Sequence, residues 1–265
     1  MSGSDRLFNA AFVRPPSSAY VNCVSKNPAR GSIDLALALA QHRTYVSLLK
    51  ESGVLVSELS PLPAYPDSVF MQDPALLGSN LSVVGRFGEE TRRGEEKAFV
   101  DELRSSRIAT GSLNFVREPG TLEGGDILVS EKKIFVGESQ RTNSDGIHQF
   151  SGMLSNRQVT SVRVKLMHLL CGCSYLNKRT MIIAPDLVSP DSFPGFKFIK
   201  IPAEEGYAAD TLYLGEGTVL VPSGFPVTIS KLRAAGYKPI EIDVSEFQKG
   251  DGGVTCLSSP VYENL

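Results

Sequence analysis

Short apolar segments and longer amphipathic segments succeed one another along most of the chain. Apolar runs with the length and composition of β-strands lie at 11–13, 53–59, 74–78, 81–87, 126–130, 133–137, 180–184, 212–215, 218–222 and 239–244. Amphipathic segments with helical spacing lie at 33–51, 92–104, 144–155 and 226–236. A helix tends to follow a pair of strands and to precede another strand, which indicates four or five repeated ββαβ-like units.

The order of these elements separates two kinds of α/β architecture. A doubly wound sheet would alternate strands and helices strictly. Here the paired runs at 126–137 and 212–222 look like hairpins, with turns at Glu131-Lys132 and Glu216-Gly217. We find no low-complexity linker, so residues 1–265 are expected to form one α/β domain.

Charge and composition exclude several classes of partner. The 27 basic and 29 acidic residues leave no basic excess to hold a nucleic-acid backbone. No apolar run approaches the roughly 20 residues needed to span a bilayer, and the N-terminal segment lacks the hydrophobic region of a signal peptide. The cysteines form no CxxC pair and none has a histidine at metal-finger spacing. We therefore expect a soluble cytoplasmic protein without a metal, a membrane or a nucleic-acid partner.

Cys256 lies in the segment GDGGVTCLSSP, among small residues that allow the backbone to turn sharply. Free cysteine is among the most buried residue types. Taken alone, Cys256 is therefore either a buried core residue or a nucleophile.

Polar clusters lie at the ends of several predicted strands, where packing does not need them. They occupy 65–77, 85–93, 118–129, 137–146 and 165–173, the last with His168 at the end of an apolar strand. Each has a structural explanation: Asp67 as a turn cap after Pro66, Arg86 and Arg92 as solvated charges, LEGGD as a hairpin turn, His168 as a core histidine. Together the clusters favour one central site built by convergent loops.

The ordered set PDSVFMQD, PGTLEGGD, GESQRTN, His168 and GGVTCLS resembles the dimethylarginine dimethylaminohydrolase family of the guanidino-modifying superfamily, from about Val13 to Ser258. The resemblance implies a five-bladed α/β propeller of ββαβ modules with pseudo-fivefold symmetry and an active site in its central channel. It also implies a cofactor-independent cysteine hydrolase. Its substrate would be a free amino acid, mono- or asymmetric dimethylarginine, converted to L-citrulline and methylamine or dimethylamine.

The resemblance also assigns catalytic roles. Cys256 would attack the guanidinium carbon to form a covalent thiouronium intermediate. His168 would protonate the leaving amine and then activate water, and Glu123 would accept a hydrogen bond from His168. Asp73 would bind the guanidinium, since carboxylates match its N–H donors. A thiol near its ordinary pKa of about 8.5 is mostly protonated at neutral pH, so the cationic substrate would favour the thiolate.

The family pattern implies further residues for the amino-acid end of the substrate. Arg86 and Arg141 match the arginines that hold the α-carboxylate, and Asp67 matches the carboxylate that receives the α-amino group. Residues 17–32 have the place and composition of the family's mobile flap. Members of the family often form homodimers, so a dimer is the expectation by analogy.

Three features depart from the family pattern. Gln72 stands where the family usually has a second acid, which predicts altered discrimination between methylated and unmethylated nitrogens, with methylated arginine preferred. Leu170 and Cys171 follow His168 where the family commonly has Lys-Ser. Pro260, in the short run after Cys256, predicts an edge-like closing strand.

Two other functions remain compatible with these residues. One is arginine deiminase or another guanidino hydrolase, although deiminases usually carry an extra helical domain for which 265 residues leave no room. The other is a propeller that binds arginine without turnover. The presence of Cys256, His168 and Glu123 together argues against a simple binding protein.

Overall fold

The computed structural model describes residues 5–108, 110–154, 156–263 and 265. Its strands are β1 (Phe8–Val13), β2 (Leu55–Glu58), β3 (Ala75–Gly78), β4 (Leu81–Val84), β5 (Ser112–Phe115), β6 (Ile127–Val129), β7 (Lys133–Glu138), β8 (Gln158–Arg163), β9 (Cys173–Tyr175), β10 (Thr180–Ile183), β11 (Lys197–Lys200), β12 (Leu212–Gly215), β13 (Thr218–Pro222), β14 (Lys238–Ile242) and β15 (Ser259–Tyr262). Its α-helices are α1 (Leu35–Glu51), α2 (Glu95–Ser105), α3 (Ser144–Met153), α4 (Pro226–Ala234) and α5 (Ser245–Gln248).

Within the described residues the strands form five three-stranded units of the same topology. The units are β15-β1-β2, β3-β4-β5, β6-β7-β8, β9-β10-β11 and β12-β13-β14. In each, the middle strand pairs antiparallel with the first strand and parallel with the third. A parallel pairing between β15 and β3 joins the first two units into a six-stranded sheet.

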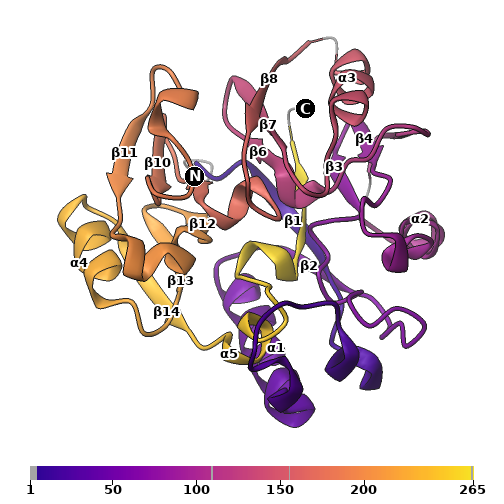
Figure 1. The fold of residues 1–265 in the computed structure, drawn as a ribbon, viewed down its shortest axis with the longest axis horizontal. Coiled ribbons are helices and arrows are strands. Elements are labelled where there is room, and N and C mark those ends of the chain that lie inside the picture. The colour runs from indigo at the N-terminus through magenta and orange to yellow at the C-terminus, as the bar shows by residue number, and fades with distance from the viewer. Residues whose placement is uncertain (1–4, 109, 155, 264) are drawn as a thin grey trace.

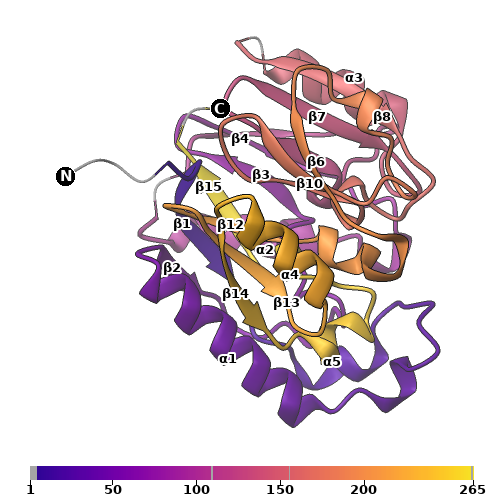
Figure 2. The same ribbon diagram turned by 90° about the vertical axis from the view of Figure 1, so that its left-hand side faces the viewer.

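The helices follow from this topology, because a parallel pair of strands needs a crossover connection. Helices α1, α2, α3 and α4 supply it in four units, while the β10–β11 connection has no α-helix. These four helices lie at the periphery and the units succeed one another around the molecule (Figure 1). Helix α1 begins at Asp34, whose side chain caps two backbone N–H groups, and it packs against β2 and β14 (Figure 2).

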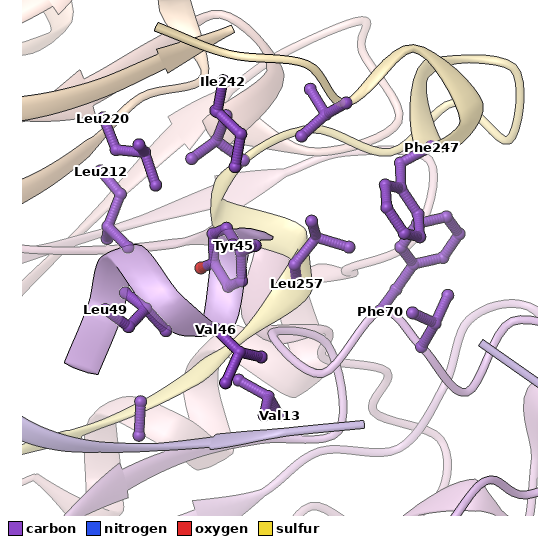
Figure 3. Close-up of a cluster of buried hydrophobic side chains, with 14 of the residues drawn as sticks. Val13, Tyr45, Val46, Leu49, Phe70, Leu212, Leu220, Ile242, Phe247 and Leu257 are labelled. Atoms are coloured by element: carbon purple, nitrogen blue, oxygen red, sulfur yellow. The ribbon is translucent and has the colours of Figure 1, made fainter. Parts of the chain in front are cut away.

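A buried apolar cluster connects α1 to the segment that carries Cys256. Figure 3 shows Tyr45, Val46 and Leu49 of α1 packed near Leu257 and strand residues of neighbouring units. The Tyr45 hydroxyl also lies 2.8 Å from the Ser258 hydroxyl. The residues directly after Cys256 are therefore fixed by the core.

Most of the predicted elements are present. Each of the ten apolar runs overlaps a strand and each of the four amphipathic segments overlaps a helix, with Ser155 at the end of the third segment outside the described residues. Both predicted hairpins are confirmed. In the second hairpin Glu216 and Gly217 have φ of 52° and 79°, the left-handed conformation that a tight hairpin turn requires.

Two local predictions were wrong. The closing strand β15 is not at an edge, because it lies between β1 and β3. His168 does not end a strand: it precedes a short 3₁₀ turn, Leu169–Cys171, that leads into β9. Within the described residues no helix is long and apolar enough to cross a membrane.

Candidate active site

The residues singled out for catalysis come from equivalent places in four of the five units. Each precedes the first strand of its unit: Asp73 before β3, Glu123 before β6, His168 before β9 and Cys256 before β15. Equivalent strand ends converge in a repeated fold, so residues as far apart in the sequence as Asp73 and Cys256 meet at one place.

Five of the predicted residues line one small cavity of about 20 Å³. They are Asp67, Asp73, Arg141, His168 and Cys256. The sequence therefore identified a real cluster, in which a cysteine, a histidine, two carboxylates and a guanidinium share one enclosed space.

Glu123 and His168 form a buried pair next to this cavity. His168 Nε2 lies 2.8 Å from Glu123 Oε2, and the backbone N–H groups of Gly88 and Glu89 donate to Oε1 at 2.9 and 3.2 Å. Burial alone would raise the pKa of Glu123, but the hydrogen bond and charge of His168 lower it. Glu123 therefore stays ionised and fixes the orientation of the His168 ring.

The imidazole of His168 is held in its charged form. Burial alone would lower its pKa, but Asp73, the hydrogen bond to Glu123 and the charge of Asp126 raise it to about 9. His168 is therefore an imidazolium at neutral pH and is ready to donate a proton.

Asp73 is fixed by three neighbours. Its Oδ2 accepts a hydrogen bond from Arg92 at 2.6 Å, its Oδ1 accepts one from the Gly125 N–H at 3.2 Å, and Oδ1 lies 3.8 Å from His168 Nδ1. A Cβ at Gly125 would lie 2.6 Å from His168 Nδ1 and 2.8 Å from Asp73 Oδ1. Glycine at position 125 is therefore required for the close approach of His168 and Asp73.

The Cys256 thiol is protonated in the unliganded protein. Burial, followed by the charges of Asp210 and Asp73, raises its pKa well above the ordinary value. Burial also raises the pKa of the Cys171 thiol, to about 12, and Cys171 does not line this cavity. A cation bound beside Cys256 would offset the two carboxylates and favour the thiolate.

The two predicted arginines lie in different places. Arg141 lines the cavity, and its nearest carboxylate oxygens, on Glu89 and Glu123, are 3.5 and 3.7 Å away. These distances exceed those of ordinary hydrogen bonds, roughly 2.7–3.2 Å, so Arg141 retains donors for an anion. Arg86 does not line the cavity: it contacts the Gly120 carbonyl at 3.4 Å and the exposed Glu118 at 3.8 Å.

Arg92, six residues after Arg86, occupies the cavity wall instead. It is buried and donates to Asp73 and to both oxygens of Glu95, and its guanidinium lies 4.4 Å from the Phe87 ring centroid. The sequence placed Arg92 in the same polar cluster as Arg86 but had no means of ranking the two. A sequence feature that could have distinguished Arg92 from Arg86 is the acidic residue Glu95, three positions after Arg92.

Gln72 does not line the cavity that contains Asp73, His168 and Cys256. Its side-chain amide donates to the Gly124 carbonyl at 3.3 Å, and it lines a second, apolar cavity of about 60 Å³ together with Leu170. Gln72 and Asp73 are consecutive residues of a turn before β3, and their side chains line different cavities. Gln72 and Leu170, two residues that depart from the family pattern, thus line the same second cavity.

The predicted flap lies over Asp67. The Val24 N–H donates to both Asp67 oxygens at 3.1 and 3.2 Å, and Val24 lines the cavity. Ser25 Oγ and the Lys26 N–H donate to Asp251 Oδ2 at 2.9 and 2.7 Å. In this arrangement residues 24–26 cover one side of the cavity.

One set of potential metal ligands exists in the part of the chain that the structure describes. Ligand atoms of Asp73, Glu123 and His168 lie within 4.8 Å of one another. All three are already engaged, since His168 pairs with Glu123 and Asp73 pairs with Arg92. The arrangement suits proton transfer and cation binding.

Comparison with known proteins identifies relatives along nearly the whole chain. The family model described as N,N dimethylarginine dimethylhydrolase, eukaryotic, matches residues 10–189, and an arginine deiminase model matches 192–263. An uncharacterized protein of Aeropyrum pernix is 42% identical over 98% of both chains. The N(G),N(G)-dimethylarginine dimethylaminohydrolase of Pseudomonas aeruginosa is 36% identical over 95% of this chain and 99% of the relative.

Solved structures agree with these sequence matches. A cysteine-to-serine mutant of the Pseudomonas aeruginosa enzyme, complexed with citrulline, has a TM-score of 0.89 at 34% identity. The alignment covers 96% of this chain and all of that one. The mixed α/β fold and the element order therefore match a solved enzyme.

Proposed function

Because the chain belongs to the dimethylarginine dimethylaminohydrolase family and is thus a hydrolase of the kind that acts on amidines, we propose that it converts an Nω-methylated L-arginine to L-citrulline and methylamine or dimethylamine. The observation that carries this proposal is the shared cavity of Cys256, His168, Asp73 and Arg141. The same family membership supports a single catalytic domain over 1–265, a five-bladed propeller arrangement of the five units and, by analogy, a homodimer.

The first half of the proposed reaction starts from a charged His168 and a protonated Cys256 thiol. The guanidinium cation binds against Asp73, the Cys256 thiol releases its proton to solvent, and the sulfur attacks the guanidinium carbon. The His168 imidazolium then donates its proton to the leaving nitrogen as the carbon–nitrogen bond breaks. A thiouronium intermediate on Cys256 and a free amine result.

The second half reverses the role of His168. The now neutral imidazole takes a proton from water as the water oxygen attacks the thiouronium carbon. The carbon–sulfur bond breaks and Cys256 leaves as a thiolate. Loss of the remaining hydroxyl proton gives citrulline, and uptake of a proton by the thiolate restores the resting thiol. Glu123 acts in both halves by holding the ring through its hydrogen bond at 2.8 Å.

Arg141 and Asp67 would receive the amino-acid end of the substrate. A charge-assisted pair with the α-carboxylate suits Arg141, which retains donors. Asp67 lies on the same cavity, and the Val24 N–H that now donates to its carboxylate would be replaced or joined by the α-amino group. A free amino acid therefore fits better than an arginine within a protein.

L-Arginine itself is the second candidate substrate. The arginine deiminase model matches the segment from 192 to 263, which contains Cys256, and Gln72 lies outside the cavity. The side chain at 72 therefore gives no reason to prefer a methylated guanidinium.

The purified protein should be incubated separately with monomethylarginine, asymmetric dimethylarginine and arginine, and citrulline measured. Cys256→Ser should abolish product formation while keeping substrate binding, and covalent labelling by a haloacetamidine should be lost with it. Citrulline from arginine at a higher kcat/KM than from either methylated substrate would replace the first candidate by the second. Citrulline from none of the three, or labelling that maps to Cys171, would refute the proposal.

A further inference from the structure

The fifth unit also places a charged residue before its first strand. Asp210 directly precedes Thr211 and β12, just as Asp73, Glu123, His168 and Cys256 precede the first strands of the other four units. Asp210 lies outside the polar clusters predicted from the sequence. The repeat of the fold therefore brings one more carboxylate toward the place where the other four residues meet.

Asp210 touches the nucleophile. Its Oδ2 lies 3.9 Å from Cys256 Sγ, which donates to it, and its Oδ1 accepts the Thr255 N–H at 2.7 Å. A Cβ at Gly253 would lie 2.2 Å from Oδ2, so the glycine allows the carboxylate to pack against the loop that carries the thiol. Asp210 is therefore held by Cys256 itself and by the residues just before it.

This carboxylate is buried and has no cationic partner. Its exposed fraction is 4%, and among the described residues no basic side chain forms an ion pair with it. Burial raises its pKa to about 6, an increase limited by hydrogen bonds from Thr255, so it is mostly ionised at neutral pH. Buried charges are normally paired, and the weak thiol donor at Oδ2 is no counter-ion.

We propose that Asp210 is a second carboxylate for the substrate guanidinium, acting together with Asp73. This inference rests on the proposed function. For attack, the guanidinium carbon must come within about 3–3.5 Å of Sγ, and its nitrogens lie one bond further out. An oxygen 3.9 Å from Sγ is then within reach of one N–H edge, and the cation supplies the missing counter-charge.

In this proposal the two carboxylates bind different N–H edges of the guanidinium. Asp73 lies beside the proton donor, with Oδ1 at 3.8 Å from His168 Nδ1, and Asp210 lies beside the sulfur. Both carboxylates raise the pKa of the Cys256 thiol in the free protein. One bound cation would neutralise both charges and so lower that pKa. The second acid that seemed to be missing at Gln72 is thus supplied by another unit.

The test compares a cationic ligand with a neutral ligand of similar shape. In the Cys256→Ser background, affinities for monomethylarginine and for citrulline are measured by calorimetry, with and without Asp210→Asn. The added substitution should weaken binding of the cation roughly 10- to 100-fold, the usual range for a hydrogen bond to a charged group, and change citrulline binding by less than about 3-fold. Glu205→Gln, a buried carboxylate that caps α4, is the matched control and should change neither affinity.

Equal losses for both ligands would show a structural role, and unchanged affinity for the cation would show no role; either overturns the proposal. If the Cys256→Ser protein binds neither ligand, the proposed function fails and the role of Asp210 falls with it. Should Asp210→Asn not fold, a crystal structure of the Cys256→Ser protein with monomethylarginine decides. A guanidinium nitrogen within about 3.5 Å of Asp210 Oδ2 supports the proposal, and a separation above about 4.5 Å refutes it.

Discussion

At the scale of single residues, the site is determined by how buried charges are paired. His168 is surrounded by Asp73, Glu123 and Asp126 and is charged, whereas Cys256 lies beside carboxylates and is neutral. The same set of carboxylates thus keeps His168 protonated and charged and keeps the Cys256 thiol protonated and neutral. In the proposed reaction, the thiol becomes reactive when the cationic substrate binds.

Arg141 and Arg86 offer a matched pair of arginine variants. Arg141→Ala should raise KM for an arginine-derived substrate about 10- to 100-fold, because it removes the cavity's available partner for the α-carboxylate. Arg86→Ala should change KM less than about 3-fold, because Arg86 lies outside the cavity. Steady-state kinetics with agmatine, which lacks the carboxylate, supplies the control. Equal effects of the two variants would place the carboxylate site elsewhere.

Glu123→Gln should move the pH dependence of catalysis. Glu123 helps to raise the pKa of His168 to about 9, so its neutral replacement lowers that pKa. The descending alkaline limb of the kcat/KM profile should therefore shift to lower pH, and kcat should fall about 10- to 1000-fold. A reduced rate with an unmoved limb would mean that Glu123 orients the ring without stabilising its charge.

At the scale of elements, strands whose side chains are buried on both faces gave the clearest sequence pattern, although the partly exposed β2 and β14 were predicted as well. The middle strands β7, β10 and β13 are continuous apolar runs and were predicted from sequence. The outer strands β5, β8 and β11 are partly exposed and mix polar with apolar residues, so their composition resembles that of loops. No property of Ser259–Tyr262 itself reveals that it pairs with both β1 and β3.

The same contrast applies to the candidate site. Cys256, His168, Glu123 and Asp73 were recognisable because each is reactive or charged beside an apolar strand. Arg86 and Arg92 share one loop, and only the path of that loop decides which of them enters the cavity. Gln72 and Asp73 are neighbours, and only the backbone decides which side each faces.

The flap is held by a residue whose backbone has an unusual conformation. Asp251 has φ of 59° and binds Ser25 and Lys26 through Oδ2. Asp251→Gly tolerates that φ but removes both contacts, so amide exchange at residues 24–27 should accelerate. Asp251→Asn keeps an acceptor oxygen and also tolerates this conformation, and is the control. Unchanged exchange in the glycine variant would show that other contacts hold the flap.

At the scale of the whole molecule, function and stability are coupled through the central charges. Three of the five units contribute to the place where Glu123, His168, Asp73 and Arg92 are buried together. Buried ions are tolerated only when each has a partner. The site therefore influences the free energy of unfolding as well as the reaction.

His168 should make that free energy depend on pH. Its folded pKa of about 9 lies above the ordinary 6.5, so its stabilising contribution is fully present below pH 6.5 and is lost as pH rises through 9. The stability gap between the wild type and His168→Gln should thus narrow by about 3 kcal/mol over this range, measured by urea unfolding. Burial lowers the pKa of His42 to about 4, so the corresponding gap for His42→Gln should stay constant above pH 6.5. A His168 gap that does not change between pH 6.5 and 9 would show that the imidazole is neutral in the folded protein, and the assignment of His168 as the proton donor would have to be abandoned.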